Sequence, residues 1–119
     1  MSKKILLIDD DRVNVNMIKA KLIEKGYDVA VAFDGEEGLA RLHDDCPNLV
    51  LLDIEMPNKD GYTFMIDVHK DESFKNIPVI VLTSHTDLKP IFELKGVKEY
   101  LVKPVNISDL IQKINQYIG

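Results

Sequence analysis

Residues 48–53 read Asn48-Leu49-Val50-Leu51-Leu52-Asp53, an unbroken apolar run that closes on one aspartate. A strand that is apolar on both faces is typical of the middle of a parallel sheet, where helices cover both sides. Two other runs have the same character, Ile5-Leu6-Leu7-Ile8 and Val79-Ile80-Val81-Leu82. The pattern therefore predicts a buried parallel sheet at the centre of the fold.

Amphipathic stretches separate these apolar runs along the chain. We expect strands at Lys4–Asp9, Tyr27–Phe33, Asn48–Asp53, Ile77–Thr83 and Glu99–Val102. We expect helices at Val13–Lys25, Glu36–His43 and Gly61–Lys70, within Ser84–Val97, and from the N-cap Asn106 onward. Five strand–helix units with short connections predict an α/β domain, with a doubly wound five-stranded parallel sheet and helices on both faces.

Apolar residues at helical spacing predict which side of each helix faces the sheet. Gly26 is expected to end the first helix in the left-handed conformation. The predicted inner faces are Met17, Ile18 and Leu22; Leu39 and Leu42; Phe64, Met65 and Val68; and Ile107, Leu110, Ile111, Ile114 and Ile118.

Length and composition limit the classes of protein. The 119 residues fit one domain, 1–119, and 45% of them are hydrophobic, which is enough for a core. The net charge of −5 argues against nucleic acid as a direct partner, because phosphate contacts need clustered Lys and Arg. No apolar run is long enough for a membrane span, and the single Cys46 excludes an internal disulfide. We expect a cytoplasmic protein.

The polar candidates for a site all lie at the ends of predicted strands. The first strand ends in Asp9-Asp10-Asp11, Asp53 closes the third, Thr83 closes the fourth, and Lys103 follows the fifth. In doubly wound sheets, ligands bind at the carboxyl ends of the strands. An aspartate run at a strand–helix junction can also serve only as a helix N-cap. The joint position of these residues at four strand ends favours a functional site.

Charge decides which chemistry suits such a site. Two carboxylates ~5 Å apart repel by about 3 kcal/mol at an effective dielectric constant near 20. A cation must offset this repulsion, and oxygen ligands without Cys or His indicate Mg²⁺ or Mn²⁺. A carboxylate, a divalent ion, a lysine and a hydroxyl together suit phosphoryl transfer, with Asp53 as nucleophile, Lys103 as a fixed charge and Thr83 as a hydrogen-bond donor.

Four motifs resemble the receiver domains of two-component response regulators, among which the chemotaxis and sporulation single-domain receivers are similar in extent. The resemblance runs from Lys4 to Ile118. Any one motif is moderately specific, whereas all four in this order are very specific. They are Ile5-Leu6-Leu7-Ile8-Asp9-Asp10-Asp11, Leu51-Leu52-Asp53-Ile54-Glu55-Met56-Pro57 with Asp60-Gly61, Val81-Leu82-Thr83-Ser84, and Tyr100-Leu101-Val102-Lys103-Pro104.

The resemblance implies a role for each matching residue. Asp53 would be the phosphoacceptor, Asp10 a direct Mg²⁺ ligand helped by Asp9, and the backbone carbonyl of Glu55 a further ligand. Lys103 would pair with Asp53 and then with the phosphoryl group. Thr83 would move to hydrogen-bond that group, with Tyr100 turning inward behind it as an aromatic switch. The family fold is flavodoxin-like, with strand order 2-1-3-4-5 and a Lys–Pro bond that is usually cis.

The resemblance also implies partners. The phosphoryl group would come from a histidine kinase or a histidine phosphotransfer protein. Phosphorylation would reshape the face made by the helix within Ser84–Val97, the strand Glu99–Val102 and the last helix, which would then meet a downstream protein. We expect a monomer or weak dimer acting as a single-domain regulator, and the alternative is a receiver domain that forms part of a longer regulator. It would not be an enzyme beyond its own phosphorylation and dephosphorylation.

The sequence departs from the family pattern in one region. Thr83 and Lys103 are 20 positions apart, about two fewer than is usual, so the intervening helix is expected to be short and to begin near Lys89. Glu55 and His85 flank the site, and we expect both to be solvated loop side chains. The alternative hypothesis is that they set the lifetime of the phosphoryl group by placing or blocking water.

Two other functions suit parts of the same pattern. A haloacid-dehalogenase-type phosphatase also uses Asp, Lys, Ser or Thr and Mg²⁺, but it carries the nucleophile on its first strand and needs a longer chain. A receiver-like module that binds proteins without being phosphorylated would usually lack part of the acidic pocket, and failure to bind Mg²⁺ would favour it.

Overall fold

The centre of the fold is a five-stranded sheet in which every strand is parallel to its neighbours. The computed structural model describes residues 3–55, 61–84 and 96–119. Its strands are β1 (Lys4–Ile8), β2 (Asp28–Ala32), β3 (Leu49–Asp53), β4 (Val79–Thr83) and β5 (Val97–Val102). They lie in the order β2-β1-β3-β4-β5. The predicted sheet and its flavodoxin-like strand order are confirmed.

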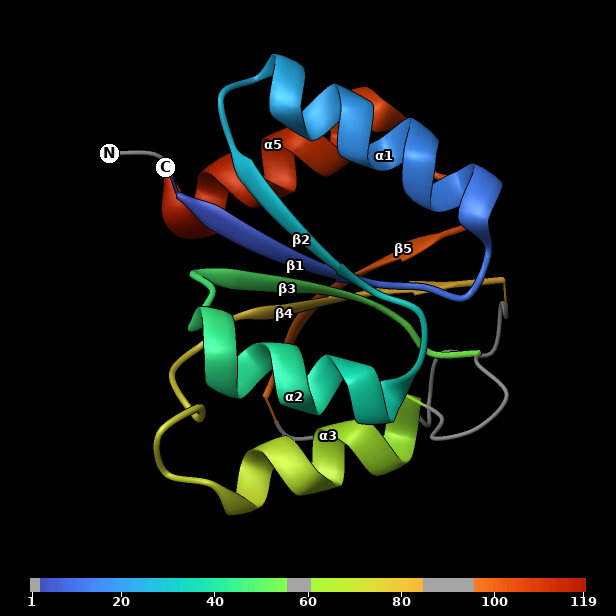
Figure 1. The fold of residues 1–119 in the computed structure, drawn as a ribbon. Helices are drawn as coiled ribbons and strands as arrows, with labels where there is room; N and C mark the ends of the chain where they lie inside the picture. Colours follow the sequence, from blue (N-terminus) through green and yellow to red (C-terminus); the bar gives the residue numbers. More distant parts are fainter. Residues whose placement is uncertain (1–2, 56–60, 85–95) are drawn as a thin grey trace.

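Helices cover both faces of this sheet. Helices α1 (Arg12–Glu24) and α5 (Ile107–Ile118) lie on one face, and α2 (Gly35–Asp45) and α3 (Gly61–Lys70) lie on the other (Figure 1). Strand β1 alternates between two apolar clusters, with Leu6 and Ile8 facing α2 and α3, and Ile5 and Leu7 facing α1 and α5. This double burial explains why the central strands are apolar throughout.

The predicted inner face of α1 is wrong at one position. Met17 is 46% exposed, whereas Val15, Ile18 and Leu22 are at most 2% exposed. Successive helical residues are about 100° apart, so Met17 lies too far around the helix from the row formed by Val15, Ile18 and Leu22. The spacing that grouped Met17 with Ile18 and Leu22 is therefore not that of the buried row, which Val15 completes instead.

The other predicted helix faces are confirmed. Leu39, Ile107, Ile111 and Ile118 are partly buried and pack against the core. Gly26 follows α1 with φ +94°, and the Asn106 side chain accepts a hydrogen bond from the Asp109 N–H at 3.1 Å, as expected of a C-terminal stop and an N-cap. The fully or nearly fully buried members of these faces are Leu42, Phe64, Met65, Val68, Leu110 and Ile114.

The ends of the strands differ from the prediction by up to two residues. Strand β5 begins at Val97 rather than Glu99, because an irregularity opposite Val79 and Ile80 lets the pairing continue past Lys98. Strand β4 begins at Val79, since Ile77 closes a turn by donating to the Phe74 carbonyl at 3.0 Å. The short helix expected near Lys89 falls outside the described residues.

Candidate functional site

Polar side chains meet where four of the strands end at one edge of the sheet. Asp9 follows β1, Asp53 closes β3, Thr83 closes β4 and Lys103 follows β5. The Lys103 N–H donates to the Thr83 carbonyl at 2.7 Å, which extends the β4–β5 pairing to the edge of the site. Asp9, Asp53 and Thr83 are each at most 1% exposed. Because a buried polar or charged group is costly without a partner, their burial indicates that each has specific partners in the fold.

Three carboxylates gather at this edge. Asp9, Asp10 and Asp53 each offer an oxygen, and these oxygens all lie within 4.8 Å of one another. Asp11 does not join them. Its side chain accepts hydrogen bonds from the Val13 and Asn14 N–H groups as the N-cap of α1. The aspartate run therefore serves both roles weighed from the sequence, capping by Asp11 and site formation by Asp9 and Asp10.

Asp53 has a partner for each of its carboxylate oxygens. Lys103 Nζ lies 3.1 Å from Asp53 Oδ2, and the Glu55 N–H donates to Asp53 Oδ1 at 3.0 Å. Burial raises the pKa of Asp53 to about 7, and the charge of Asp9 adds to the rise. The hydrogen bond from Glu55 and the charge of Lys103 act in the opposite direction. Burial and the neighbouring negative charge outweigh these two partners.

The pKa of Lys103 is also shifted by the charges at this edge of the sheet. Burial lowers the pKa of Lys103, but the hydrogen bond to Asp53 and the charges of Asp53, Asp9 and Glu55 outweigh it. The pKa of Lys103 is therefore raised. Neighbouring negative charge raises both pKa values, but burial is the main cause of the rise at Asp53, whereas the carboxylates alone cause the rise at Lys103.

Asn14 is a functional candidate that the sequence reasoning missed. Its side-chain Nδ2 donates to Asp9 Oδ2 at 2.7 Å, and the Asp11 N–H donates to Asp9 Oδ1 at 2.9 Å. Both oxygens of Asp9 are therefore held in place. The available signal was the position of Asn14 in the first turn after the cap, which lies beside the end of β1.

Glu55 is not the solvated side chain that we expected from the sequence. Glu55 Oε1 accepts the Thr83 hydroxyl at 2.6 Å and the Ser84 N–H at 2.7 Å. Glu55 Oε2 accepts the Ser84 hydroxyl. The expectation failed because the pairing of β3 with β4 brings the end of one strand beside the end of the other, which the local sequence does not reveal. His85 falls outside the described residues.

Two further residues named from the sequence lie on β5 and just after it. Tyr100 is partly buried and packs against the cluster on the α2 and α3 side of the sheet. The peptide bond between Lys103 and Pro104 is cis, as the resemblance implied. The site residues thus come from the carboxyl ends of β1, β3, β4 and β5.

The carboxylate oxygens at this edge are suitable ligands for a small, hard divalent cation. Asp9, Asp10 and Asp53 present carboxylate oxygens, the ligands that Mg²⁺ and Mn²⁺ prefer. Only Lys103 offsets their charge by a salt bridge among the residues that the structure describes. Three carboxylate oxygens also leave coordination positions for water or a substrate oxygen.

The sequence matches one family along most of its length. The model of the response regulator receiver domain matches residues 5–115. The response regulator PleD of Caulobacter vibrioides is 36% identical over 117 residues, which are 96% of this chain but 26% of PleD. The protein PilG of Pseudomonas aeruginosa is 33% identical over 117 residues, which are 97% of this chain and 87% of PilG. The chain thus spans about a quarter of PleD and most of PilG.

Solved structures share the whole fold. The chemotaxis protein CheY4 of Vibrio cholerae has a TM-score of 0.92 and 28% identity, with 98% of this chain and 99% of that chain covered. The receiver domain of a sensor histidine kinase from Pseudomonas aeruginosa has a TM-score of 0.90 and 27% identity, with 100% and 99% covered. That receiver domain was solved with a magnesium ion coordinated in its active-site cleft.

Proposed function

The chain belongs to the response regulator receiver domain family of two-component signalling, and on that premise we propose that Asp53 accepts a phosphoryl group in a Mg²⁺-dependent reaction. One observation carries the proposal. The buried Asp53 carboxylate lies 3.1 Å from the Lys103 ammonium and within 4.8 Å of oxygens of Asp9 and Asp10. A nucleophile, a fixed cation and two metal ligands therefore surround one point at the sheet edge.

The residues divide the chemistry between them. Asp9, Asp10, Asp53 and the backbone carbonyl of Glu55 would hold the ion. Bound Mg²⁺ supplies positive charge that neutralises the phosphoryl oxygens during transfer. An Asp53 oxygen forms a bond to phosphorus while the bond from phosphorus to the donor's imidazole nitrogen breaks, and that nitrogen keeps the electron pair. Lys103 pairs with the transferred group, and the Thr83 hydroxyl donates a hydrogen bond to it.

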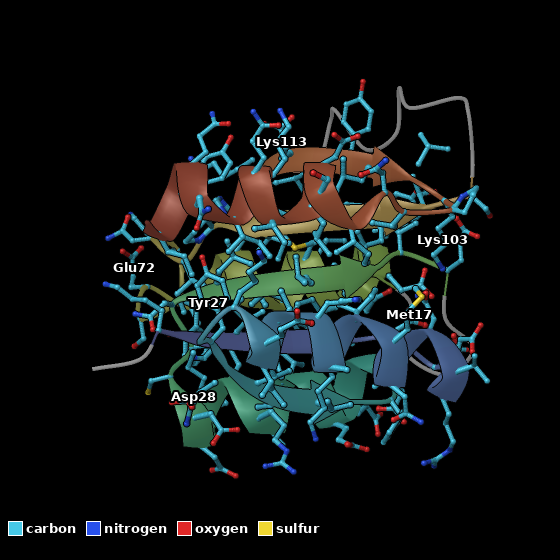
Figure 2. All side chains as sticks on the ribbon, turned by 90° about the horizontal axis from the view of Figure 1, so that it is seen from above. Met17, Tyr27, Asp28, Glu72, Lys103 and Lys113 are labelled. Atoms are coloured by element: carbon cyan, nitrogen blue, oxygen red, sulfur yellow. The ribbon has the colours of Figure 1, made fainter. Side chains whose placement is uncertain are left out.

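The donor would be a histidine kinase or a histidine phosphotransfer protein, because receiver domains work with such proteins. An exposed apolar strip near the site suits protein docking. On α1, Val13 is 80% exposed and Met17 is 46% exposed, and Figure 2 shows Met17 at the same end of the molecule as Lys103. A donor that covers this strip would bring its phosphohistidine to the open, exposed side of the site, where Asp10 lies.

Phosphorylation would act on the output by a shift of population. The phosphoryl group would favour the conformer in which Thr83 has moved toward Asp53 and Tyr100 has turned inward, which changes the face that includes β5 and α5. A complete switch from about 1:99 to 99:1 needs roughly 5.5 kcal/mol of differential stabilisation. A downstream protein would read this face. The monomer or weak dimer, the cytoplasmic location and the short helix before β5 remain predictions.

The two alternatives stand differently. The family match excludes the phosphatase, and Asp53 lies on the third strand of the chain rather than the first. Within the part of the chain that the structure describes, no helix has the length and apolar character needed to cross a bilayer.

The phosphorylation-independent module is tested by incubating the protein with acetyl phosphate, with and without Mg²⁺, and measuring its intact mass. We expect a Mg²⁺-dependent gain of one phosphoryl group that Asp53→Asn abolishes, whereas no gain in the wild type would favour the module.

A further inference from the structure

The Glu55 side chain connects the nucleophile's strand to the hydroxyl that is expected to bind the phosphoryl group. Its carboxylate accepts three hydrogen bonds at the end of β4, from the Thr83 hydroxyl at 2.6 Å, from the Ser84 N–H at 2.7 Å and from the Ser84 hydroxyl. Hydrogen bonds to an ionised acceptor are about twice as strong as neutral ones. Glu55 is therefore a substantial contributor to the observed position of Thr83 and Ser84.

The main chain of Glu55 makes a contact of its own at the site. Its N–H donates to Asp53 Oδ1 at 3.0 Å, so the residue contacts the nucleophile directly. The preceding residue, Ile54, is covered by the start of α3. A Cβ atom at Gly61 would lie 2.6 Å from the Ile54 Cα, and the Gly61 N–H donates to the Ile54 carbonyl at 3.2 Å. The main chain immediately before Glu55 is thus packed closely against the start of α3.

A hydroxyl has one proton to donate, and the Thr83 proton is directed at Glu55. A phosphoryl group on Asp53 would need the same proton, and it would bring a charge of roughly −1.5 to −2 close to the Glu55 carboxylate. The two acceptors cannot both be satisfied by Thr83, and their charges repel each other. We infer that Glu55 is a positioning residue that stabilises the unphosphorylated conformation and competes with the phosphoryl group for the Thr83 hydroxyl.

This inference rests on the proposed function and adds a regulatory element to the same site. Glu55 would supply its backbone carbonyl to the ion and would hold Thr83 away with its side chain. A residue that stabilises the conformer unable to bind a ligand lowers the fraction of molecules that can bind it. The apparent affinity for that ligand falls by the same factor. Truncation of Glu55 should therefore strengthen binding of a phosphoryl mimic, whereas truncation of Lys103 or Thr83 should weaken it.

The first measurement tests the contact itself in metal-free, unphosphorylated protein. Hydrogen exchange of the Ser84 amide is followed by NMR in the wild type, in Glu55→Ala and in Glu55→Asp, which keeps the charge but shortens the reach. Glu36→Ala is the matched control, because Glu36 is an exposed carboxylate at the start of α2. We expect exchange at Ser84 to accelerate about tenfold or more in both Glu55 variants and to stay unchanged in the control. Unchanged exchange in Glu55→Ala and Glu55→Asp would overturn the inference.

The second measurement tests the competition, with beryllofluoride and Mg²⁺ as the phosphoryl mimic. We expect Glu55→Ala to bind the mimic about tenfold more tightly than the wild type, the factor that corresponds to loss of one charge-assisted hydrogen bond of modest strength. Glu36→Ala should bind like the wild type. If the wild type binds the mimic and Glu55→Ala binds it equally or more weakly, Glu55 does not compete. If the wild type does not bind it at all, the proposed function fails together with the competition, whatever the Ser84 exchange shows.

Discussion

Lys103 Nζ lies 3.1 Å from Asp53 Oδ2 and is the one cation in salt-bridge contact with the acidic group in the part of the chain described. Asp53 is 1% exposed, and oxygens of Asp9 and Asp10 lie within 4.8 Å of one of its own. One ammonium group therefore faces three carboxylates. Burial and this excess of negative charge together disfavour ionisation of Asp53 in the metal-free protein.

The metal-free protein should lose stability as the pH rises toward neutrality. Burial raises the pKa of Asp53 from 3.8 to about 7 in the folded state. The folded state therefore keeps a proton that the unfolded chain has released, and the contribution to the free energy of unfolding is full below about pH 4 and lost as the pH passes 7. In EDTA at pH 8, Asp53→Asn should be about 1–3 kcal/mol more stable than the wild type by urea unfolding.

The comparison at low pH is the control for this effect. At pH 4 the Asp53 carboxyl is protonated in the folded wild type, so the two proteins should differ by less than about 1 kcal/mol. An Asp53→Asn variant that is less stable than the wild type at pH 8 would show that the ionised carboxylate, paired with Lys103, stabilises the fold.

Mg²⁺ should bind to the folded protein and raise its thermal midpoint. Oxygens of Asp9, Asp10 and Asp53 supply the ligands, and a ligand at 100 times its Kd adds about 2.7 kcal/mol to the free energy of unfolding. For a domain of this size that corresponds to a rise of roughly 8–15 °C, which EDTA should reverse. Differential scanning calorimetry across a Mg²⁺ titration gives the Kd.

Asn14 should control that affinity without being a ligand. Its Nδ2 holds Asp9 Oδ2 at 2.7 Å, and loss of such a supporting hydrogen bond typically lowers metal affinity by about 10- to 100-fold. Asn14→Ala should fall in this range, whereas Asn16→Ala, an exposed position on the same helix, should not change the Kd. Equal Mg²⁺ affinities in the two variants would mean that Asp9 holds its position without Asn14.

Lys103 should matter more for phosphoryl transfer than for metal binding. Its ammonium group pairs with Asp53 at 3.1 Å and would stabilise the charge that develops on the phosphoryl oxygens. Removal of one preorganised donor of this kind costs about 100-fold or more in rate. Lys103→Met should therefore be phosphorylated by acetyl phosphate about 100-fold more slowly, with a Mg²⁺ affinity no weaker than that of the wild type. A rate within threefold of the wild type would contradict this role.

Substitutions in the exposed apolar strip on α1 should slow phosphoryl transfer from a protein donor but not from a small-molecule donor. Val13→Glu and Met17→Glu should slow transfer from a phosphorylated histidine phosphotransfer protein about tenfold or more, because each puts an unpaired charge into an apolar contact. Phosphorylation by acetyl phosphate should not change. Ile23→Glu is the control, since Ile23 is 52% exposed at the other end of the same helix. Equal transfer rates in all three variants would remove this strip from the docking surface.

The sequence predicted what depends on local pattern. Short apolar runs between amphipathic stretches placed the strands. The segregation of Asp9, Asp53, Thr83 and Lys103 at strand ends placed the site, because parallel strands share one carboxyl edge. Met17 was assigned wrongly because it was grouped by spacing with Ile18 and Leu22, whereas the buried row is Val15, Ile18 and Leu22. The contacts of Glu55 with Thr83 and of Asn14 with Asp9 could not be predicted, since they depend on which strand ends lie side by side in three dimensions and on side-chain rotamers.

The most direct test of the account identifies the phosphorylated residue. Borohydride reduces an acyl phosphate to an alcohol, so an aspartyl phosphate is read as homoserine in a peptide mass spectrum. After incubation with acetyl phosphate and Mg²⁺, we predict homoserine at position 53, and none when EDTA replaces Mg²⁺. Homoserine at position 9 or 10, or unmodified peptides throughout, would contradict the claim that Asp53 is the phosphoacceptor.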